Sequence, residues 1–289
     1  MTAIHLVAVR RAEMRSRGHA LSALCGAVAL AVALACGPAG AQGNSDLKEL
    51  IDDLVAANQV LAKAGVVDSF GHVSARHPAN PDRFLLSQAK SPARVTADDI
   101  MEFDLDGRTI DGRDRPTYSE RFIHAEIYRA RKDVNGVIHS HSPGVIPFGV
   151  TQIPLRAISH TAPFLASGVP VFEIRTVAGM SDLLVTDAKR GKALAETLGD
   201  RPVALMRGHG MVVVGPSLRR TVVRAVYTEI NARLLWQVLT LGTPVTYLSP
   251  EEGAILEKRN DATAKGHGGD RVWENLKADV LGTAPGGAR

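Results

Sequence analysis

Cysteine is almost missing from this chain of 289 residues, and its two cysteines, Cys25 and Cys36, both lie within the first 41 residues. That segment has the composition of a removable leader. Once it is removed, the remaining chain holds no thiol, which excludes disulfide bonds and a cysteine nucleophile. Such a chain would tolerate an oxidising compartment.

Aromatic residues and net charge are also scarce. Phe, Trp and Tyr make up 4% of the chain, so its core must be built from Val, Ile, Leu and Ala. The whole chain carries a formal net charge of +4. Residues 1–41 hold four Arg and one Glu, which leaves 30 basic and 29 acidic side chains and a net charge of +1. This balance gives no electrostatic reason to expect nucleic acid as a partner.

The N-terminal segment predicts a secretory signal peptide over residues 1–41. Four arginines precede an apolar run at residues 20–35, and a small-x-small pattern at residues 39–41 follows. The run is shorter than the roughly 20 apolar residues of a membrane span, which disfavours an uncleaved anchor. Lipidation at Cys36 and a translation start at Met14 stay open as variants. We therefore expect a periplasmic or secreted protein with no membrane span after cleavage.

The remaining length, about 250 residues, suits one α/β domain. We expect this domain over residues 42–258, followed by a polar C-terminal tail over residues 259–289. The tail begins with a glycine-rich stretch, and its VWENLKADVL segment predicts a last short helix.

Apolar periodicity predicts a mixture of helices and strands. Helical spacing marks residues 46–64, with Asp46 as cap and Gly65 as end, and then residues 119–133 and 218–241. In the last helix, the predicted buried stripe consists of Val222, Val223, Val226, Ile230 and Leu234. Short strands are expected in FGHVSAR, RFLLS, VIHSHS, VALM and MVVVG, with a strand pair around Asp106-Gly107. Because helices and strands do not alternate strictly, a layered sandwich is favoured over a doubly wound parallel sheet.

Three histidines form a candidate metal site. His139 and His141 stand two residues apart on a predicted strand, so their imidazoles share one face. His209 lies between two glycines, Gly208 and Gly210, which leave room for a close approach. Three histidines with an open position are typical of a catalytic zinc or a similar divalent ion. Taken alone, each histidine could also be an ordinary hydrogen-bonded residue.

Glu120 is the candidate acid/base group, because it opens the helix that leads into the His139 strand. A carboxylate beside a metal can be a ligand, a general base, or both in turn. In isolation it could equally be a first-turn acid that favours the helix dipole. His124 lies one helical turn further on and is expected to pack against the helix or to orient Glu120.

A cupin-like barrel is the other fold considered for an H-x-H strand. Such a barrel would place a Glu within a few residues after the pair, whereas SPGVIPFGV follows here. The long helices also oppose it.

The ordered motifs resemble the class II aldolase/adducin family over residues 47–246. They are the loop Gly71-His72-Val73-Ser74, the pair Ser119-Glu120, the H-x-H of His139 and His141, and His209-Gly210. The resemblance implies an α/β fold, a three-layer α/β/α sandwich with a mostly antiparallel central sheet. It also implies a homotetramer with sites at subunit interfaces. By the match, His139, His141 and His209 hold one divalent metal ion, with zinc as the first expectation and manganese or iron as alternatives, and Glu120 is catalytic.

Two departures bear on the substrate. Sugar-phosphate aldolases of the family carry Asn where this chain has His72, and they cradle phosphate in a glycine-containing loop. The corresponding stretch here, residues 86–91, has no glycine, so the substrate is expected to lack a phosphate. Expected substrate contacts are Gly71, His72, Ser74, Lys90 and Ser119. Arg76 and Arg94 are further cations that could meet a carboxylate.

The closer resemblance is to decarboxylases of aromatic degradation, which act on hydroxy-carboxymuconic semialdehyde or dihydroxyphthalate-type acids. It rests on FGHVSARHP, ERFIH, IHSHSP and ALMRGHG. The implied activity is metal-dependent decarboxylation of a small non-phosphorylated hydroxy or keto acid. An aldolase acting on a small aldehyde or ketol is the alternative. A non-haem iron oxygenase and a non-catalytic adducin-like binding domain are further alternatives.

Overall fold

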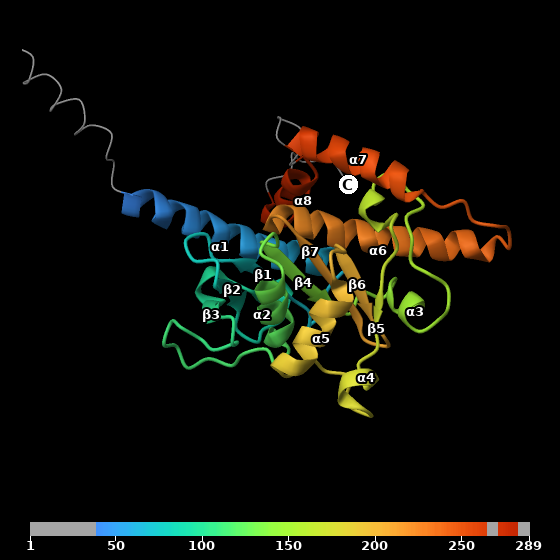
Figure 1. The fold of residues 1–289 in the computed structure, drawn as a ribbon. Helices are drawn as coiled ribbons and strands as arrows, with labels where there is room; N and C mark the ends of the chain where they lie inside the picture. Colours follow the sequence, from blue (N-terminus) through green and yellow to red (C-terminus); the bar gives the residue numbers. More distant parts are fainter. Residues whose placement is uncertain (1–38, 265–270, 283–289) are drawn as a thin grey trace, which may run out of the picture. The chain divides into compact units, whose positions relative to one another are not determined.

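The apolar strands assemble into one seven-stranded sheet in the order β3-β2-β1-β4-β7-β6-β5 (Figure 1). The computed structural model describes residues 39–264 and 271–282. All neighbouring strands pair antiparallel except β5 and β6, which are parallel. The strands are β1 His72–Arg76, β2 Arg83–Ser87, β3 Ile100–Asp104, β4 Gly136–Ser140, β5 Val171–Phe172, β6 Val203–Met206 and β7 Gly210–Gly215.

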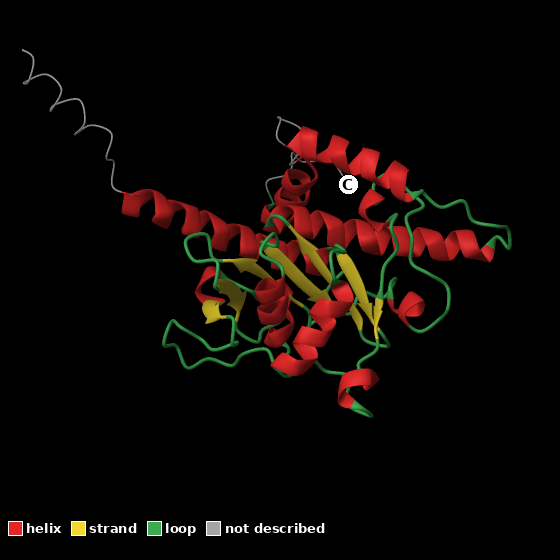
Figure 2. Ribbon diagram, viewed as in Figure 1, coloured by secondary structure: helices red, strands yellow, loops and turns green. Residues whose placement is uncertain are grey.

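Helices cover both faces of this sheet (Figure 2). They are α1 Ala39–Lys63, α2 Arg121–Ala130, α3 Ile146–Gly149, α4 Arg175–Ala178, α5 Ala188–Leu198, α6 Leu218–Thr240, α7 Pro250–Ala264 and α8 Arg271–Leu281. Single 3-10 turns are η1 Pro92–Arg94, η2 Ala97–Asp99 and η3 Pro163–Leu165. The α/β class and the mostly antiparallel sheet of the sequence prediction are confirmed.

Alternation along the strands sorts the side chains between two buried clusters. Val73, Ile138 and Val213 face α1 and α6 in the first cluster. Val137 and Val212, the neighbours of Ile138 and Val213, face α2 and α5 in the second cluster. Each strand therefore contributes side chains to two hydrophobic cores, one on each face of the sheet. The helices on each face cover the core there.

Two helix details correct the sequence prediction. α1 begins at Ala39, so Asp46 lies inside the helix and is not its cap; Gly65 does follow its end, with φ +67°. In α6, Ile230 and Leu234 were predicted to be buried, but they are 41% and 40% exposed. Thr228, Asn231, Ala232 and Leu235 are buried in their place. The apolar spacing of the sequence predicted burial along a longer part of this helix than the sheet covers.

Other elements were missed or weaker than expected. The strand pair around Asp106 is reduced to β3 and a single bridge, Phe103 to Thr109. α5 and α7 had no predicted counterpart. The expected C-terminal helix is present as α8, whose Trp273 is buried against the first cluster.

The chain divides into two units, Met1–Gln42 and Gly43–Arg289, and the account here concerns the second. Residues 1–38 of the predicted signal peptide lie outside the described residues. Within the described part, none of the helices has the length and apolar character needed to cross a bilayer. The boundary expected after residue 258 stays a prediction, and α7 runs across it.

Candidate metal centre and active site

His139 stands on β4 in the middle of the sheet and is fully buried. It lies opposite His72 on β1 and Val212 on β7. Its Nδ1–H donates to the backbone carbonyl of Met211 at 3.2 Å. Its Nε2 is buried and has no hydrogen-bond partner in the part of the chain that the structure describes. A buried nitrogen without a partner is costly unless it binds something else.

His141 follows the end of β4, and its side chain keeps 22% exposure. Its Nδ1 lies 3.0 Å from Oδ2 of Asp68. The other oxygen of Asp68 accepts the backbone N–H groups of Phe70 and Gly71 at 2.8 and 3.1 Å. Burial raises the Asp68 pKa, but these bonds and His141 outweigh it, and the net pKa is lowered. Asp68 is therefore an ionised orienting group for His141, which the sequence interpretation missed.

His209 lies in the turn between β6 and β7, where the flanking glycines have a structural task. Gly208 takes φ +64°. A Cβ on Gly210 would overlap the backbone carbonyl of Ser140, so only glycine lets the turn approach β4 this closely. Nδ1–H of His209 donates to the carbonyl of Leu183 at 3.0 Å. Its Nε2 lies 3.0 Å from Nε2 of His141.

The three histidines therefore share one tautomer. Each Nδ1 is engaged by an oxygen, which leaves the lone pair of each Nε2 directed away from that bond. Together with a Glu120 oxygen, these nitrogens lie within 4.8 Å of one another. Lone pairs facing each other at 3.0 Å repel, and a divalent cation between them would remove the repulsion. The donor set thus fits the metal that the sequence predicted.

Glu120 is the N-cap residue of α2 and is 7% exposed. One carboxylate oxygen accepts the backbone N–H of Val185 at 2.8 Å. The other lies 3.5 Å from Nε2 of both His139 and His209. Burial raises the Glu120 pKa, but the two histidines outweigh burial and lower it below its ordinary value. Glu120 is therefore a carboxylate at the centre of the histidine set.

A short loop between α4 and α5 holds two of these groups. Leu183 accepts the bond from His209, and Val185, two residues on, donates to Glu120. Leu183 has φ +67° and is the only non-glycine residue with positive φ in the described residues. Arg190 on α5 donates to the Leu184 carbonyl at 2.8 Å and supports the loop from behind. No sequence signal pointed to this loop, because its contribution is made by backbone atoms.

α2 and α5 also pack unusually closely. Gly191 on α5 faces the backbone of Phe122 on α2, where a Cβ would come within 2.6 Å of the carbonyl oxygen. Only glycine permits this approach. The close packing brings the start of α5, and with it the Leu183 loop, against the start of α2. Glu120 is fixed at that meeting point.

His72 and Ser74 lie on β1 beside the metal centre, but neither is an open surface contact. Both are buried, and His72 packs on the rings of Tyr118 and His139 at 4.5 and 5.1 Å. His124 lies between them, 2.6 Å from Nδ1 of His72 and 2.6 Å from the hydroxyl of Ser74. The expectation that His124 orients Glu120 is wrong, because it contacts His72 and Ser74 instead.

The other predicted substrate contacts differ from one another in burial and in the groups they bind. Gly71 is buried, and its N–H holds Asp68. Ser119 is exposed next to Glu120. Lys90 keeps 34% side-chain exposure and pairs with the buried Asp99 at 2.6 Å. Arg76 binds the backbone carbonyls of Pro81, Tyr128, Arg131 and Val134, so it serves the fold and not a substrate.

Glu229 on α6 is a second orienting carboxylate, which the sequence analysis did not identify. It is 2% exposed and accepts bonds from the hydroxyl of Ser142 and from the N–H of Gly144, the latter at 3.0 Å. Glu229 therefore clamps the segment that follows His141.

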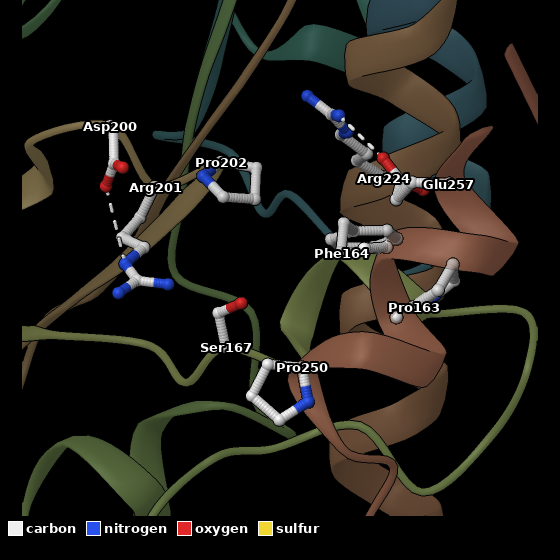
Figure 3. A pocket seen from close by; sticks show the side chains of 11 residues that line it. Pro163, Phe164, Ser167, Asp200, Arg201, Pro202, Arg224, Pro250 and Glu257 are labelled. Carbon is white, nitrogen blue, oxygen red and sulfur yellow. Dashed lines mark hydrogen bonds and ion pairs between the residues drawn. The ribbon is translucent and has the colours of Figure 1, made fainter.

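A surface hollow of about 260 Å³ lies away from these groups, between η3, α6 and α7 (Figure 3). Arg224 and Glu257 pair across it, and Asp200 and Arg201 form a second pair at its edge. It includes Pro202 at the start of β6, whereas His209 follows the end of that strand. None of the four metal-site residues lines this hollow.

Comparison with known proteins identifies the scaffold. The family model described as Class II Aldolase and Adducin N-terminal domain matches residues 52–236. The chain belongs to this family. Its relatives include decarboxylase tropJ of Talaromyces stipitatus, 34% identical over 200 residues that cover 65% of this chain and 75% of the relative. The 3,4-dihydroxyphthalate decarboxylase of Arthrobacter keyseri is 32% identical over 218 residues, covering 70% of this chain and 84% of the relative.

Solved structures agree with this assignment of the fold. An aldolase II superfamily protein from Pseudomonas syringae superposes with a TM-score of 0.68 and 22% identity, covering 88% of this chain and 98% of that one. The resemblance to the class II aldolase family and its decarboxylase subgroup is thus confirmed. This class II aldolase-family member is a carbon–carbon lyase, as its decarboxylase and aldolase relatives are.

Proposed function

We propose that this protein is a divalent-metal-dependent decarboxylase of a small, non-phosphorylated hydroxy or keto acid of the aromatic-degradation type. The observation that carries the proposal is the convergence of three Nε2 atoms and the Glu120 carboxylate within 4.8 Å. The two decarboxylase relatives support the reaction type. The absence of glycine in residues 86–91 supports a substrate without phosphate.

His139, His141 and His209 would hold the cation, with zinc as the first candidate and manganese or iron as alternatives. When bound, such a cation supplies a Lewis acid for a substrate oxygen that gains negative charge. Each histidine is held by its own partner: Met211, Asp68 or Leu183. Because these partners fix the rings before any ligand arrives, little reorganisation is needed on binding.

Glu120 would move the proton. As a carboxylate, it accepts the proton of a phenolic hydroxyl of the substrate. The electron pair on that oxygen forms a carbonyl, and the ring carbon that bears the carboxylate takes the proton back from Glu120. The bond from this carbon to the carboxylate carbon then breaks, its electron pair moves through the ring to the carbonyl oxygen, and carbon dioxide leaves. The resulting phenolate takes its proton from water. The N–H of Val185 holds the carboxylate in place throughout.

His72 and Lys90 are the main proposed substrate contacts. Lys90 would share its charge between Asp99 and a substrate carboxylate. Ser119, exposed beside Glu120, could also contact substrate. Gly71 and Ser74 act on the site through Asp68 and His124, to which they are bonded.

The deciding experiment combines metal content with product analysis. Purified protein is assayed for bound metal by elemental analysis and for carbon dioxide release from 3,4-dihydroxyphthalate and related hydroxy acids. The proposal expects about one divalent ion per chain and stoichiometric carbon dioxide. Release of an aldehyde from a ketol without carbon dioxide would replace decarboxylase by aldolase. Oxygen uptake that matches turnover would indicate an iron oxygenase, and a chain that binds no metal would indicate a binding domain.

We also propose a homotetramer, exported as a periplasmic or secreted protein. The assembly is supported by Ile230, Leu234 and Leu241, which form one exposed apolar stripe on and just after α6. Residues at this spacing share a helical face, and such a stripe is unfavourable in water. Light scattering of wild type and of Leu234→Glu tests the assembly. N-terminal sequencing of the mature protein tests cleavage after residue 41.

A further inference from the structure

A row of four buried polar groups runs from α2 to the edge of the metal centre. The Tyr128 hydroxyl lies 2.9 Å from that of Ser74, which lies 2.6 Å from Nδ1 of His124. Nε2 of His124 lies 2.6 Å from Nδ1 of His72. Every one of these residues is at most 1% exposed. Water is therefore not available to replace a missing bond, and each hydrogen must go to a group in the row.

The row has a direction, and Tyr128 sets it. The only acceptor for the Tyr128 hydrogen among the described residues is the Ser74 oxygen. The opposite direction would leave the buried Tyr128 hydrogen without an acceptor, which is costly. Tyr128 therefore donates to Ser74.

The remaining hydrogens follow from that first one. Ser74 has a single hydrogen, which goes to Nδ1 of His124. His124 is then protonated on Nε2 and donates to Nδ1 of His72. A ring nitrogen that accepts a bond carries no hydrogen, so His124 and His72, each accepting on Nδ1, are both neutral. A neutral His72 whose Nδ1 accepts a bond must carry its hydrogen on Nε2.

We propose that His72 presents a fixed Nε2–H donor to an oxygen of the substrate, and that Tyr128, Ser74 and His124 are positioning residues that set this tautomer. His72 stands opposite His139 in the β1–β4 register, with the two rings 5.1 Å apart. The side-chain hydrogen bond of His72 within the described residues is made by Nδ1, and none is made by Nε2. The inference rests on the proposed function for the identity of the acceptor, an oxygen that gains charge as carbon dioxide leaves.

Such a donor differs from a cationic one. A neutral N–H that is already oriented stabilises a developing oxyanion without needing to reorganise during the reaction. It also adds no positive charge beside three metal ligands.

The first test is direct and independent of substrate. Neutron diffraction from crystals of the zinc-loaded protein exchanged into D2O locates the hydrogens of the row. The proposal expects deuterium on Nε2 of His72, none on its Nδ1, and deuterium on Nε2 of His124. Deuterium on Nδ1 of His72, or on both of its nitrogens, would overturn it. Because no turnover is involved, this result stands whether or not the chain is a decarboxylase.

The second test separates positioning from folding. Ser74→Ala removes the donor to His124 and frees the tautomer of His72; we expect about a tenfold fall in kcat with metal content unchanged. His72→Leu should cost about 100-fold, and His72→Asn less because it keeps an N–H. Thr221→Val, which removes another buried hydroxyl, far from the centre on α6, is the control for stability.

Two results of the second test would contradict the proposal. One is a Ser74→Ala protein that matches Thr221→Val in kcat per bound metal. The other is a His72→Asn protein as inactive as His72→Leu. If wild type binds zinc but releases no carbon dioxide, the proposed reaction has failed, and the neutron result still decides the tautomer.

Discussion

The two faces of the central sheet contrast strongly around β1 and β4. Toward α1 and α6, these strands present Val73, Ala75 and Ile138, all buried and apolar. Toward α2 and α5, the neighbouring positions are His72, Ser74 and His139, equally buried and polar. On these strands, the residues that face α1 and α6 form an apolar core. The residues next to them in the sequence face α2 and α5 and form the polar site.

The contrast shows how a chain with a small free energy of unfolding can accommodate buried polar groups, which lower its stability. Polar groups buried on the α2 side need partners, and nearly all have them in His124, Asp68 and the Leu183 loop. Among the described residues, the exceptions are Nε2 of His139, which a cation would satisfy, and Nε2 of His72. Burial of apolar side chains on the α1 side adds stability without affecting the site. Changes on the two faces should therefore separate activity from stability.

Removing a metal ligand should give the largest loss of activity. His139→Ala deletes a buried nitrogen donor, so activity should fall to background and bound metal from about one ion per chain to almost none. Elemental analysis and carbon dioxide release measure both. His160→Ala, in an exposed loop, is the matched control. A variant that loses metal yet keeps full activity would refute the role of the centre.

Neutralising Glu120 should come next. Glu120→Gln keeps the shape and still accepts the Val185 N–H, but it cannot take up a proton, so kcat should fall about 10²- to 10⁴-fold with metal retained. Rapid-mixing assays on metal-loaded protein give the rate. Glu126→Gln on the same helix controls for loss of a buried charge. Undiminished kcat would remove Glu120 from the proton transfer.

Changes at Leu183 should have an intermediate effect. Leu183→Ile places a β-branched residue at φ +67°, which strains the loop that holds Glu120 and His209. We expect kcat to fall about tenfold, since small misplacements of reacting groups are costly. Leu183→Asn tolerates positive φ and should retain more activity despite losing the apolar side chain. The reverse order of the two variants would show that side-chain packing matters more than the backbone conformation.

An aliphatic substitution on the other face should leave catalysis almost unchanged. Ile138→Ala, next to His139 but directed toward the first cluster, should lower the free energy of unfolding by about 2–5 kcal/mol. kcat per metal-loaded, folded chain should stay near wild type. Denaturant unfolding and kinetics on the same preparation measure the two quantities. A large loss of kcat with metal retained would show that the two faces are coupled.

The amount that sequence could predict differs between these regions. Periodicity and turn residues were enough for β4, β6, β7 and α6, since each has strong local apolar spacing. They failed for α5, whose Gly191 and charged residues make a poor helical signal. They also failed for Ile230 and Leu234, because apolar spacing cannot reveal where a long helix extends past the sheet.

The sequence by itself determined the fold class and the three histidines with Glu120, because motif order and the two-residue repeat of a strand are local properties. Only the tertiary structure decided which groups orient them. Asp68 lies 73 residues along the chain from His141, Glu229 lies 87 from Ser142, and His124 lies 52 from His72. The Leu183 carbonyl lies 26 residues from His209. Contacts at such separations, and those made by backbone atoms, depend on how the strands and helices pack, which no local pattern records.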